Sequence, residues 1–204
     1  MEEGYIKFSC HWDKQDFIKQ EHISEINQWR KALWDIQLIG TYPNGIGYGN
    51  ISERWQGNQF IISGTNTGKI ENLTNHEYAL VINYSIDLNS VGCKGMTIAS
   101  SESLTHAAIY EASEKINSVI HIHHSLFWEY LLKSGLKSPA AISYGTPEMA
   151  YALKNIVSKR PNDVNLLIAM EGHQDGIIAC GKNAEDAFLY LLQKFNSFME
   201  IRKY

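Results

Sequence analysis

The chain contains 204 residues, of which 44% are hydrophobic and 11% aromatic, enough to bury one sizeable core. Its 18 basic and 22 acidic residues give a formal net charge of -4. This balance lacks the basic excess that nucleic-acid binding requires and the acidic excess of a disordered tail. We therefore expect a single domain over residues 1–204 that binds no nucleic acid.

The cysteines and the apolar runs indicate a cellular location. Cys10, Cys93 and Cys180 are far apart and odd in number, which favours reduced thiols in a cytosolic protein over a disulfide framework. Residues Met1 to Gly4 are acidic and lack the apolar segment of a leader, and the longest apolar runs are too short to span a bilayer. We expect a cytoplasmic protein with no membrane attachment.

The first half of the chain combines one helix with short strands and turn-rich loops. Apolar residues recur at helical spacing from about residue 22 to residue 38, and Gly40 is predicted to stop the run. Apolar, β-prone runs predict strands at residues 5–10, 50–54, 59–63 and 78–84. Two loops rich in turn-forming residues, 42–49 and 64–68, are candidate ligand loops.

The second half of the chain changes to longer helices that alternate with apolar strands. Its pattern predicts helices at residues 102–116, 126–132, 147–157 and 185–198. Strands are predicted at residues 119–123, 164–170 and 176–180. Pro147 supports the start of its helix, because proline in the first helical turn removes no intrahelical hydrogen bond. This alternation is typical of a layered α/β domain.

Three of the eight histidines fall in one short segment, Val119 to His124. Alternate side chains of a strand point to the same face, so His121 and His123 project together, about 6 to 7 Å apart at Cα. This spacing suits two imidazoles that bind one metal ion, with His124 out of phase. The alternative, ordinary core histidines, explains less well why two lie together on an apolar strand.

A catalytic zinc site uses three or four protein groups, so further ligands are needed. His173 follows an apolar strand and lies between glycines, where α/β folds place functional loops, although a surface histidine explains it equally well. Glu102 follows two serines at a helix start, where the helix dipole alone favours a carboxylate. His106, four residues later on the same helix face, is a candidate partner that orients Glu102.

Four segments in this order resemble the class II aldolase and adducin family. They are Gly49-Asn50-Ile51-Ser52, Ser100-Ser101-Glu102 with His106, His121-Ile122-His123, and His173 ahead of a Gly-Ile-Ile-Ala strand. Members such as L-fuculose-1-phosphate aldolase hold zinc with a glutamate, an H-x-H pair and a distal histidine. The resemblance implies a Zn2+ site made of Glu102, His121, His123 and His173. It also implies a single-domain layered α/β/α fold with a central, largely antiparallel sheet.

The same resemblance implies a binding site for a small sugar phosphate, formed by two loops and a helix start. The implied phosphate-binding residues are Gly49, Asn50, Ser52, Thr65, Asn66, Thr67, Gly68, Ser100 and Ser101. Their chemistry agrees, because glycine lets backbone N–H groups approach a phosphate while Asn, Ser and Thr add neutral donors. Turn formation alone would also explain these residues, and the 64–68 loop fits the family least well.

The implied reaction is that of a zinc-dependent aldolase or lyase, in which the metal stabilises an enediolate and Glu102 transfers the proton. Related L-ribulose-5-phosphate 4-epimerases place an aspartate at this position, so Glu102 favours an aldolase or a methylthioribulose-1-phosphate dehydratase. A 4-epimerase on the same scaffold and a non-enzymatic, adducin-like interaction module remain alternatives. The family also implies a homotetramer with active sites between subunits.

Two departures from the family concern the catalytic acid and the last ligand. The segment between His123 and His173 is shorter than in the aldolases, where it carries a tyrosine from a neighbouring subunit. Tyr144 is the candidate catalytic replacement, although packing at a strand end would also explain it, and Tyr204 near the C-terminus is a second candidate. Two residues separate His173 from the next glycine, which makes Asp175 a rival ligand.

Overall fold

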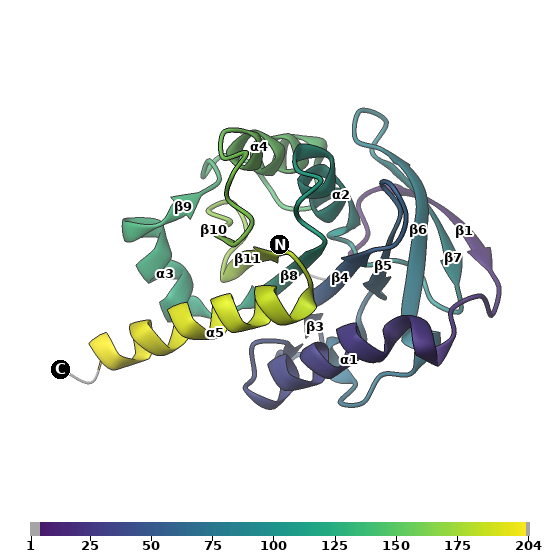
Figure 1. Ribbon diagram of the computed structural model, residues 1–204, viewed down its shortest axis with the longest axis horizontal. Helices are drawn as coiled ribbons and strands as arrows, with labels where there is room; N and C mark the ends of the chain where they lie inside the picture. Colours follow the sequence, from purple (N-terminus) through teal and green to yellow (C-terminus); the bar gives the residue numbers. More distant parts are fainter. Residues whose placement is uncertain (1–4, 203–204) are drawn as a thin grey trace.

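The computed structural model describes residues 5–202, so the predictions for Met1 to Gly4 and for Tyr204 lie outside the described residues. Helices cover both faces of one large β-sheet, as Figure 1 shows. The helices are α1 (Gln20–Asp35), α2 (Ser103–Ala112), α3 (Ser125–Ser134), α4 (Pro147–Ser158) and α5 (Ala184–Ile201). Two short 3-10 turns, η1 (Thr67–Lys69) and η2 (Asn75–Glu77), lie between strands.

The described part of the chain forms a nine-stranded sheet in the order β1-β7-β6-β5-β4-β8-β11-β10-β9. Its strands are β1 (Ser9–Lys14), β4 (Asn50–Arg54), β5 (Phe60–Ser63), β6 (Tyr78–Ser85), β7 (Ser90–Gly95), β8 (Ser118–His123), β9 (Leu136–Lys137), β10 (Leu166–Ala169) and β11 (Gly176–Gly181). A separate hairpin joins β2 (Gly40–Thr41) and β3 (Gly47–Tyr48). Only the outermost pairs, β1 with β7 and β9 with β10, are parallel. The predicted α/β fold with a largely antiparallel central sheet is confirmed.

Each face of the sheet is buried under its own set of helices. α2 and α4 pack on the face that includes Val119 of β8 and Ile178 of β11. α1, α3 and α5 cover the opposite face, which includes Ile120 and Ile122. All six residues of β8 are buried, because helices cover this strand on both sides. The three-layer arrangement therefore places β8 in the middle of the protein.

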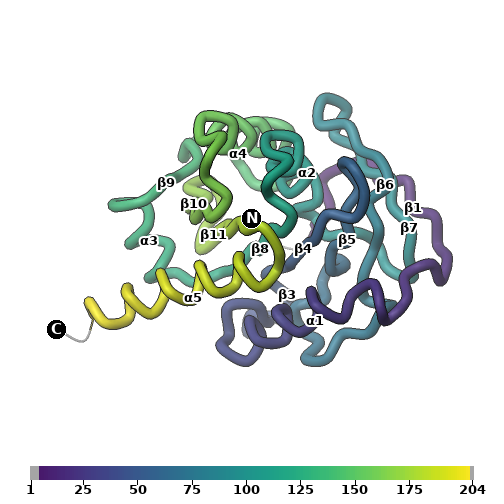
Figure 2. The backbone as a smooth tube through the Cα atoms, viewed as in Figure 1, coloured from purple at the N-terminus to yellow at the C-terminus, as the bar shows by residue number. Residues whose placement is uncertain are grey.

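The two halves of the chain meet in the middle of the sheet, where β4 pairs with β8. Asn50 lies opposite His121 in this antiparallel register, and Ser52 lies opposite Val119. Figure 2 shows the junction by colour, with the blue β4 beside the teal β8. The pairing brings the loops before β4 next to the histidine strand.

Several boundaries differ from the sequence prediction; α2, for example, ends at Ala112 and not at residue 116. β1 begins at Ser9 and not at residue 5, because it pairs in parallel with β7, a strand that the pattern did not predict. β7 contains two glycines and a lysine among its six residues, so it lacks regular apolar alternation. α1 ends at Asp35, ahead of Gly40, because Gln37 takes the left-handed conformation (φ 59°) that stops the helix.

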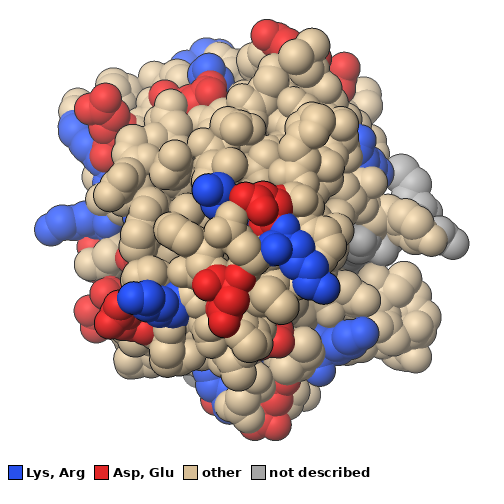
Figure 3. Space-filling model, turned by 90° about the vertical axis from the view of Figure 1, so that its right-hand side faces the viewer, with Lys and Arg blue, Asp and Glu red and all other residues tan. Residues whose placement is uncertain are grey.

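The surface carries charges of both signs. Lys and Arg side chains are interspersed with Asp and Glu on the face shown in Figure 3. None of the helices formed by residues 5–202 combines the length and apolar composition needed to cross a membrane.

Candidate metal centre

β8 carries two of the predicted ligands on one side of the sheet. Its side chains alternate, so Ile120 and Ile122 pack toward α1, α3 and α5. His121 and His123 lie on the other side, where Val119 packs with α2 and α4. Both imidazoles are buried, and their Nε2 atoms are 2.9 Å apart. The strand period therefore places two metal-binding side chains together.

His173 reaches the same place from the loop between β10 and β11. The loop is tight, because the His173 N–H donates to the Met170 carbonyl and the Gly176 N–H donates to the His173 carbonyl, each at 2.9 Å. A Cβ at Gly176 would lie 3.0 Å from the His173 ring and 3.1 Å from that of His121. Gly176 therefore leaves the space that the two imidazoles occupy.

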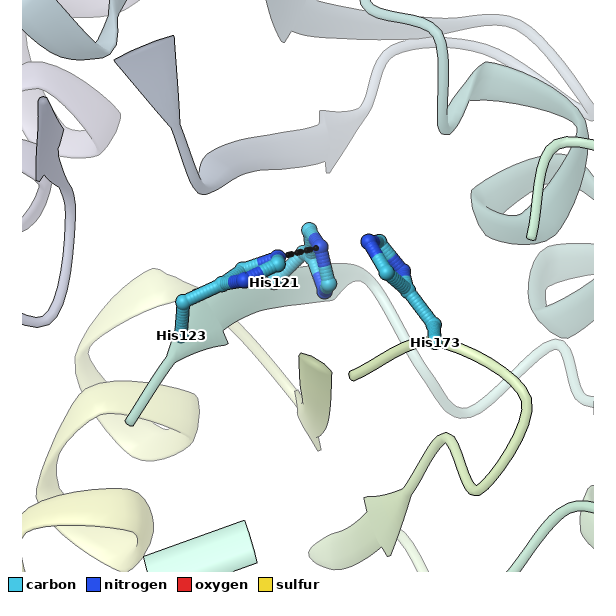
Figure 4. A group of neighbouring side chains, drawn as sticks. All are labelled: His121, His123 and His173. Carbon is cyan, nitrogen blue, oxygen red and sulfur yellow. Dashed lines mark hydrogen bonds between the residues drawn. The ribbon is translucent and has the colours of Figure 1, made fainter. Parts of the chain in front are cut away.

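The three imidazoles form a buried histidine cluster, which Figure 4 shows on one side of β8. One nitrogen of each of His121, His123 and His173 lies within 4.8 Å of the others. Burial, followed by the neighbouring His123 and His173, holds the pKa of His121 well below its usual value. Because neutral imidazole is the form that binds a metal ion, this environment favours ligation.

The histidine cluster has the donor set of a zinc site. Imidazole nitrogens that share one tetrahedral Zn2+ at about 2.0–2.1 Å lie about 3.4 Å from one another. This separation falls between the 2.9 Å that separates the Nε2 atoms of His121 and His123 and the 4.8 Å within which all three nitrogens lie. Three converging imidazole nitrogens therefore fit a divalent ion of the zinc type.

Glu102, the fourth predicted ligand, lies beside the histidine cluster at the N-cap of α2 and is not part of the metal-binding group found in residues 5–202. Its side chain is 2% exposed, and Oε1 is 3.8 Å from Nδ1 of His173. The other oxygen, Oε2, accepts a hydrogen bond of 2.8 Å from the Thr105 hydroxyl. The helix start thus holds one carboxylate oxygen on Thr105 and the other near the imidazoles.

His106, the predicted partner of Glu102, faces elsewhere. Its Nδ1 is 2.7 Å from the Ser52 hydroxyl, which is also 2.7 Å from the Tyr110 hydroxyl. We call these buried residues, Ser52, His106 and Tyr110, the core network. Burial lowers the pKa of His106 to about 3. The prediction that His106 orients Glu102 was wrong, because Thr105, one position earlier in α2, makes that contact.

Two neighbouring candidates lie outside the histidine cluster. Asp175 takes a left-handed conformation (φ 67°) and is absent from the metal-binding group found in residues 5–202. It lines a hollow together with His123 and His124 and without His121 or His173, which line a different pocket. The His124 side chain caps α3, where its Nδ1 accepts the Phe127 N–H at 3.1 Å. The structure therefore does not place Asp175 as a rival of His173.

Tyr144 packs directly on the histidine cluster. Its ring stacks on that of His173, with centroids 4.2 Å apart and planes inclined by 18°. The Lys7 ammonium lies 3.5 Å from the centre of the Tyr144 ring and donates to the Tyr144 carbonyl at 2.8 Å. The stacked ring restricts the orientation of His173, and Lys7 adds a cation that sequence reasoning missed.

Tyr42 also contacts the histidine cluster, although sequence reasoning did not select it. Its hydroxyl is 2.7 Å from Nδ1 of His123, whose Nε2 faces His121. A hydrogen bond at one ring nitrogen of a metal-binding histidine fixes which nitrogen is left to bind the metal. The signal that could have found Tyr42 is its place in the 42–49 loop, which precedes the strand paired with β8.

The histidine cluster opens into a pocket built by the loops of the first half and the start of α2. Its lining residues are Gly47, Tyr48, Gly49, Asn50, Gly64, Asn66, Gly68, Ser100, Ser101, Glu102, His121, Tyr144 and His173. The predicted phosphate-binding residues on this lining are Gly49, Asn50, Asn66, Gly68, Ser100 and Ser101. Gly47, Tyr48 and Gly64 also line the pocket; they lie in the two turn-rich loops singled out from the sequence, although they were not among the predicted phosphate-binding residues.

Three predicted phosphate-binding residues, Ser52, Thr65 and Thr67, are not on the lining of the pocket. Ser52 is turned into the core network by its hydrogen bond to His106. The Thr67 hydroxyl donates to the Gly64 carbonyl at 2.8 Å and so closes its own loop. The two side-chain hydroxyls are thus used inside the protein.

Comparison with known sequences and structures places the fold in a family. Residues 44–194 match the class II aldolase and adducin N-terminal domain, and no match was found among curated proteins. An L-fuculose 1-phosphate aldolase is similar at a TM-score of 0.65 and 18% identity, over 87% of this chain and 82% of that chain. A sugar-phosphate aldolase from Thermotoga maritima is similar at 0.64 and 16%, over 90% and 94%.

YgbL from Klebsiella pneumoniae, described as an aldolase, epimerase or decarboxylase, is similar at a TM-score of 0.68 and 14% identity, over 91% of each chain. At these identities the structural similarity concerns the fold. The family match covers most of the chain and includes Glu102 and all three histidines of the cluster. The chain therefore belongs to the class II aldolase and adducin family.

Proposed function

We propose that this chain is a zinc-dependent aldolase, or a close lyase, that acts on a small sugar phosphate. The observation that carries the proposal is the buried convergence of His121, His123 and His173, with one nitrogen of each within 4.8 Å of the others. Class II aldolases use a divalent metal ion, and this donor set suits zinc.

A divalent ion at the histidine cluster would polarise a substrate carbonyl and stabilise the negative charge left when a C–C bond breaks. The protein's part is to hold the imidazoles in the orientation in which their nitrogens converge. Tyr42 contacts Nδ1 of His123, and the Tyr144 ring stacks on His173. These contacts support the metal-binding orientation of two of the three ligands.

Glu102 is the residue that we assign to proton transfer. Its carboxylate is buried, and Oε1 lies 3.8 Å from His173 Nδ1 at the edge of the histidine cluster. The Thr105 hydroxyl holds Oε2, which fixes the carboxylate without neutralising it. A carboxylate held in this way can take a proton from a substrate hydroxyl or return one to carbon.

The phosphate is assigned to the pocket wall around the start of α2. Ser100 and Ser101 line the pocket directly before this helix, whose N-terminal N–H groups and dipole favour an anion. Asn50 and Gly68 line the same wall, and the buried Asn50 Oδ1 has no partner among the described residues. A sugar phosphate bound here would direct its carbonyl end toward the histidine cluster.

We also propose a cytoplasmic homotetramer with active sites between subunits, since aldolases of this family often form oligomers. A 4-epimerase or a methylthioribulose-1-phosphate dehydratase would use the same histidine cluster, and an adducin-like interaction module would not need it.

The test is an aldol-cleavage assay of the zinc-loaded protein with a panel of ketose 1-phosphates. We expect dihydroxyacetone phosphate to be released from at least one sugar, to stop after chelation and to resume when zinc is restored. Inversion of a carbon centre without cleavage would assign an epimerase, and loss of water would assign a dehydratase. Absence of all turnover with zinc bound would contradict an enzymatic role.

A further inference from the structure

Arg30 of α1 is a buried cation that forms no ion pair with a carboxylate of residues 5–202. Its side chain is 1% exposed, and Tyr78 is the one titratable neighbour that contributes to its electrostatic environment within residues 5–202. A guanidinium removed from water requires hydrogen-bond acceptors, and its field is screened much less than that of a surface charge. The position of those acceptors therefore decides where this charge acts.

The hydrogen bonds of Arg30 all go to one loop beside the pocket. Nη1 donates to the Glu71 carbonyl at 2.6 Å, and Nη2 donates to the carbonyls of Thr67 at 2.9 Å and Gly68 at 3.5 Å. Thr67 and Gly68 begin the turn η1, and Gly68 lines the pocket. The guanidinium thus lies directly behind the wall assigned to the phosphate.

The Thr67 contact also sets the direction of a backbone donor. In a trans peptide the C=O and N–H groups point in opposite directions. The Thr67 carbonyl points at Arg30, so the N–H of Gly68, which belongs to the same peptide, points away from Arg30. A charged donor on the carbonyl polarises the peptide and strengthens its N–H as a donor.

The pocket itself supplies little positive charge. Its lining within residues 5–202 contains no lysine or arginine, and it includes the carboxylate of Glu102. Lys7 lies nearby, but its ammonium stacks on the Tyr144 ring and interacts electrostatically with the Glu102 carboxylate. A phosphate bound among neutral Asn, Ser and Gly residues would therefore depend on helix and peptide dipoles and on a charge behind them.

We propose that Arg30 is a positioning residue for anion binding. It holds the peptide groups of Thr67 and Gly68 in place, and it supplies a positive charge on the side of these peptides that faces away from the pocket. This inference rests on the proposed sugar-phosphate site. Two consequences separate it from a purely structural role of Arg30. The affinity for phosphate depends on the charge at this position, and a lysine restores much of what an uncharged residue loses.

The experiment measures binding of inorganic phosphate to the full chain by calorimetry, so it requires no turnover. Arg30→Met is expected to raise the phosphate dissociation constant about tenfold, because it removes the charge and its hydrogen bonds. Arg30→Lys is expected to stay within about threefold of the wild type, since it keeps the charge. Urea unfolding of each variant reports the accompanying loss of stability.

Asn27→Ala is the matched control, because Asn27 of α1 tethers the same segment without a charge. Its amide donates to the Leu73 carbonyl and accepts the Tyr78 hydroxyl, each at 2.9 Å. The control is expected to lose stability and to keep the phosphate dissociation constant within about twofold. If phosphate binding is weakened equally in Asn27→Ala and Arg30→Met, the inference is overturned, because the effect would then come from loss of loop structure and not from loss of the charge.

The remaining outcomes separate this inference from the proposed function. Unchanged phosphate affinity in Arg30→Met overturns the role of Arg30 alone, and absence of phosphate binding to the wild type overturns the phosphate site as well. If Arg30→Met does not fold, an NMR titration of the wild type decides. The Gly68 amide and the Arg30 Nε resonance must shift with one common dissociation constant, and an unshifted Arg30 resonance overturns the inference.

Discussion

Two neighbouring groups of buried polar side chains, the core network and the histidine cluster, lie at the centre of the sheet. They differ in which atoms their polar groups contact. In the core network, the Ser52 hydroxyl lies 2.7 Å from both the His106 ring and the Tyr110 hydroxyl. In the histidine cluster, the nearest polar neighbours include the other imidazoles, which converge within 4.8 Å. Burial is common to both groups, so convergence of nitrogen atoms, and not burial, distinguishes ligands from core histidines.

The two groups also differ in their expected effect on folding. The core network joins β4 to α2 through two hydrogen bonds of the Ser52 hydroxyl, which form without a metal ion, so it stabilises the fold in the metal-free state. The histidine cluster brings three imidazoles together out of water, and a bound metal ion would offset the cost of burying them. Substitutions in the cluster should therefore change metal binding and turnover, and substitutions in the network should change stability.

His173→Ala should have the largest effect, because it removes one of three converging nitrogen donors. We expect the cleavage rate to fall by more than about 10³-fold together with the bound metal, measured by a coupled assay and elemental analysis. Asp175→Ala is the matched control from the same loop and should keep both within about twofold. Metal loss in Asp175→Ala but not in His173→Ala would make Asp175 the ligand.

Glu102→Gln should separate proton transfer from metal binding by the histidine cluster. The amide keeps the shape of the side chain but cannot accept the proton, so we expect kcat to fall about 10²- to 10⁴-fold while the metal is retained. Glu111→Gln is a control on the same helix, where Glu111 pairs with Lys154 at 2.6 Å on the surface. An unchanged kcat in Glu102→Gln would contradict the assignment.

Two substitutions of Tyr144 test whether its ring or its hydroxyl matters to the cluster. Tyr144→Ala removes the ring stacked on His173 and should weaken metal binding about 10- to 100-fold. Tyr144→Phe keeps the ring, so metal affinity should stay within about threefold in a competition titration with a chelator. A drop in kcat in Tyr144→Phe with metal retained would instead assign the hydroxyl to proton transfer.

His106→Gln should affect stability and its pH dependence, and leave the metal content unchanged. Burial lowers the folded-state pKa of His106 to about 3, below its usual value of 6.5. Between these values the unfolded chain binds the proton and the folded chain does not, so the free energy of unfolding falls as the pH falls through this window. This one group contributes up to about 1.4 kcal/mol per pH unit.

The variant should therefore show a shallower loss of stability between pH 6.5 and pH 4, measured by urea unfolding of chelator-treated protein. Its free energy of unfolding at pH 7 should be about 1–3 kcal/mol lower, since the Ser52 hydroxyl loses its partner. The same pH slope in both proteins would show that His106 is not held neutral by the fold.

The sequence predicted the features that depend on local periodicity. The alternation of β8 placed His121 and His123 on one face, and Pro147 marked the first residue of α4. Periodicity could not show depth. The family resemblance assigned Ser52 to the pocket, and Ser52 does share a strand face with Asn50, but it lies two residues further along β4, where its hydroxyl contacts His106. The two-residue period of a strand shows which face a side chain is on, but it does not show which residues of other elements pack against that side chain.

Features that depend on distant partners could not be predicted. β1 and β7 pair in parallel across a long stretch of chain, and their sequences lack the alternation that marks a half-buried strand. Tyr42 and Lys7 reach the site through loops and an N-terminal segment whose course the sequence does not specify. Arg30 looked like an ordinary helix residue, and only the fold shows that its charge lies behind the pocket.

Zinc stoichiometry decides whether the histidine cluster is a metal site. Elemental analysis should compare the wild type, the double variant His121→Ala, His123→Ala, and the control His124→Ala, whose side chain caps α3 outside the cluster. We expect about one zinc per chain in the wild type and the control and less than about a tenth of that in the double variant. Zinc retained by the double variant, or missing from the wild type after zinc loading, would contradict the metal site.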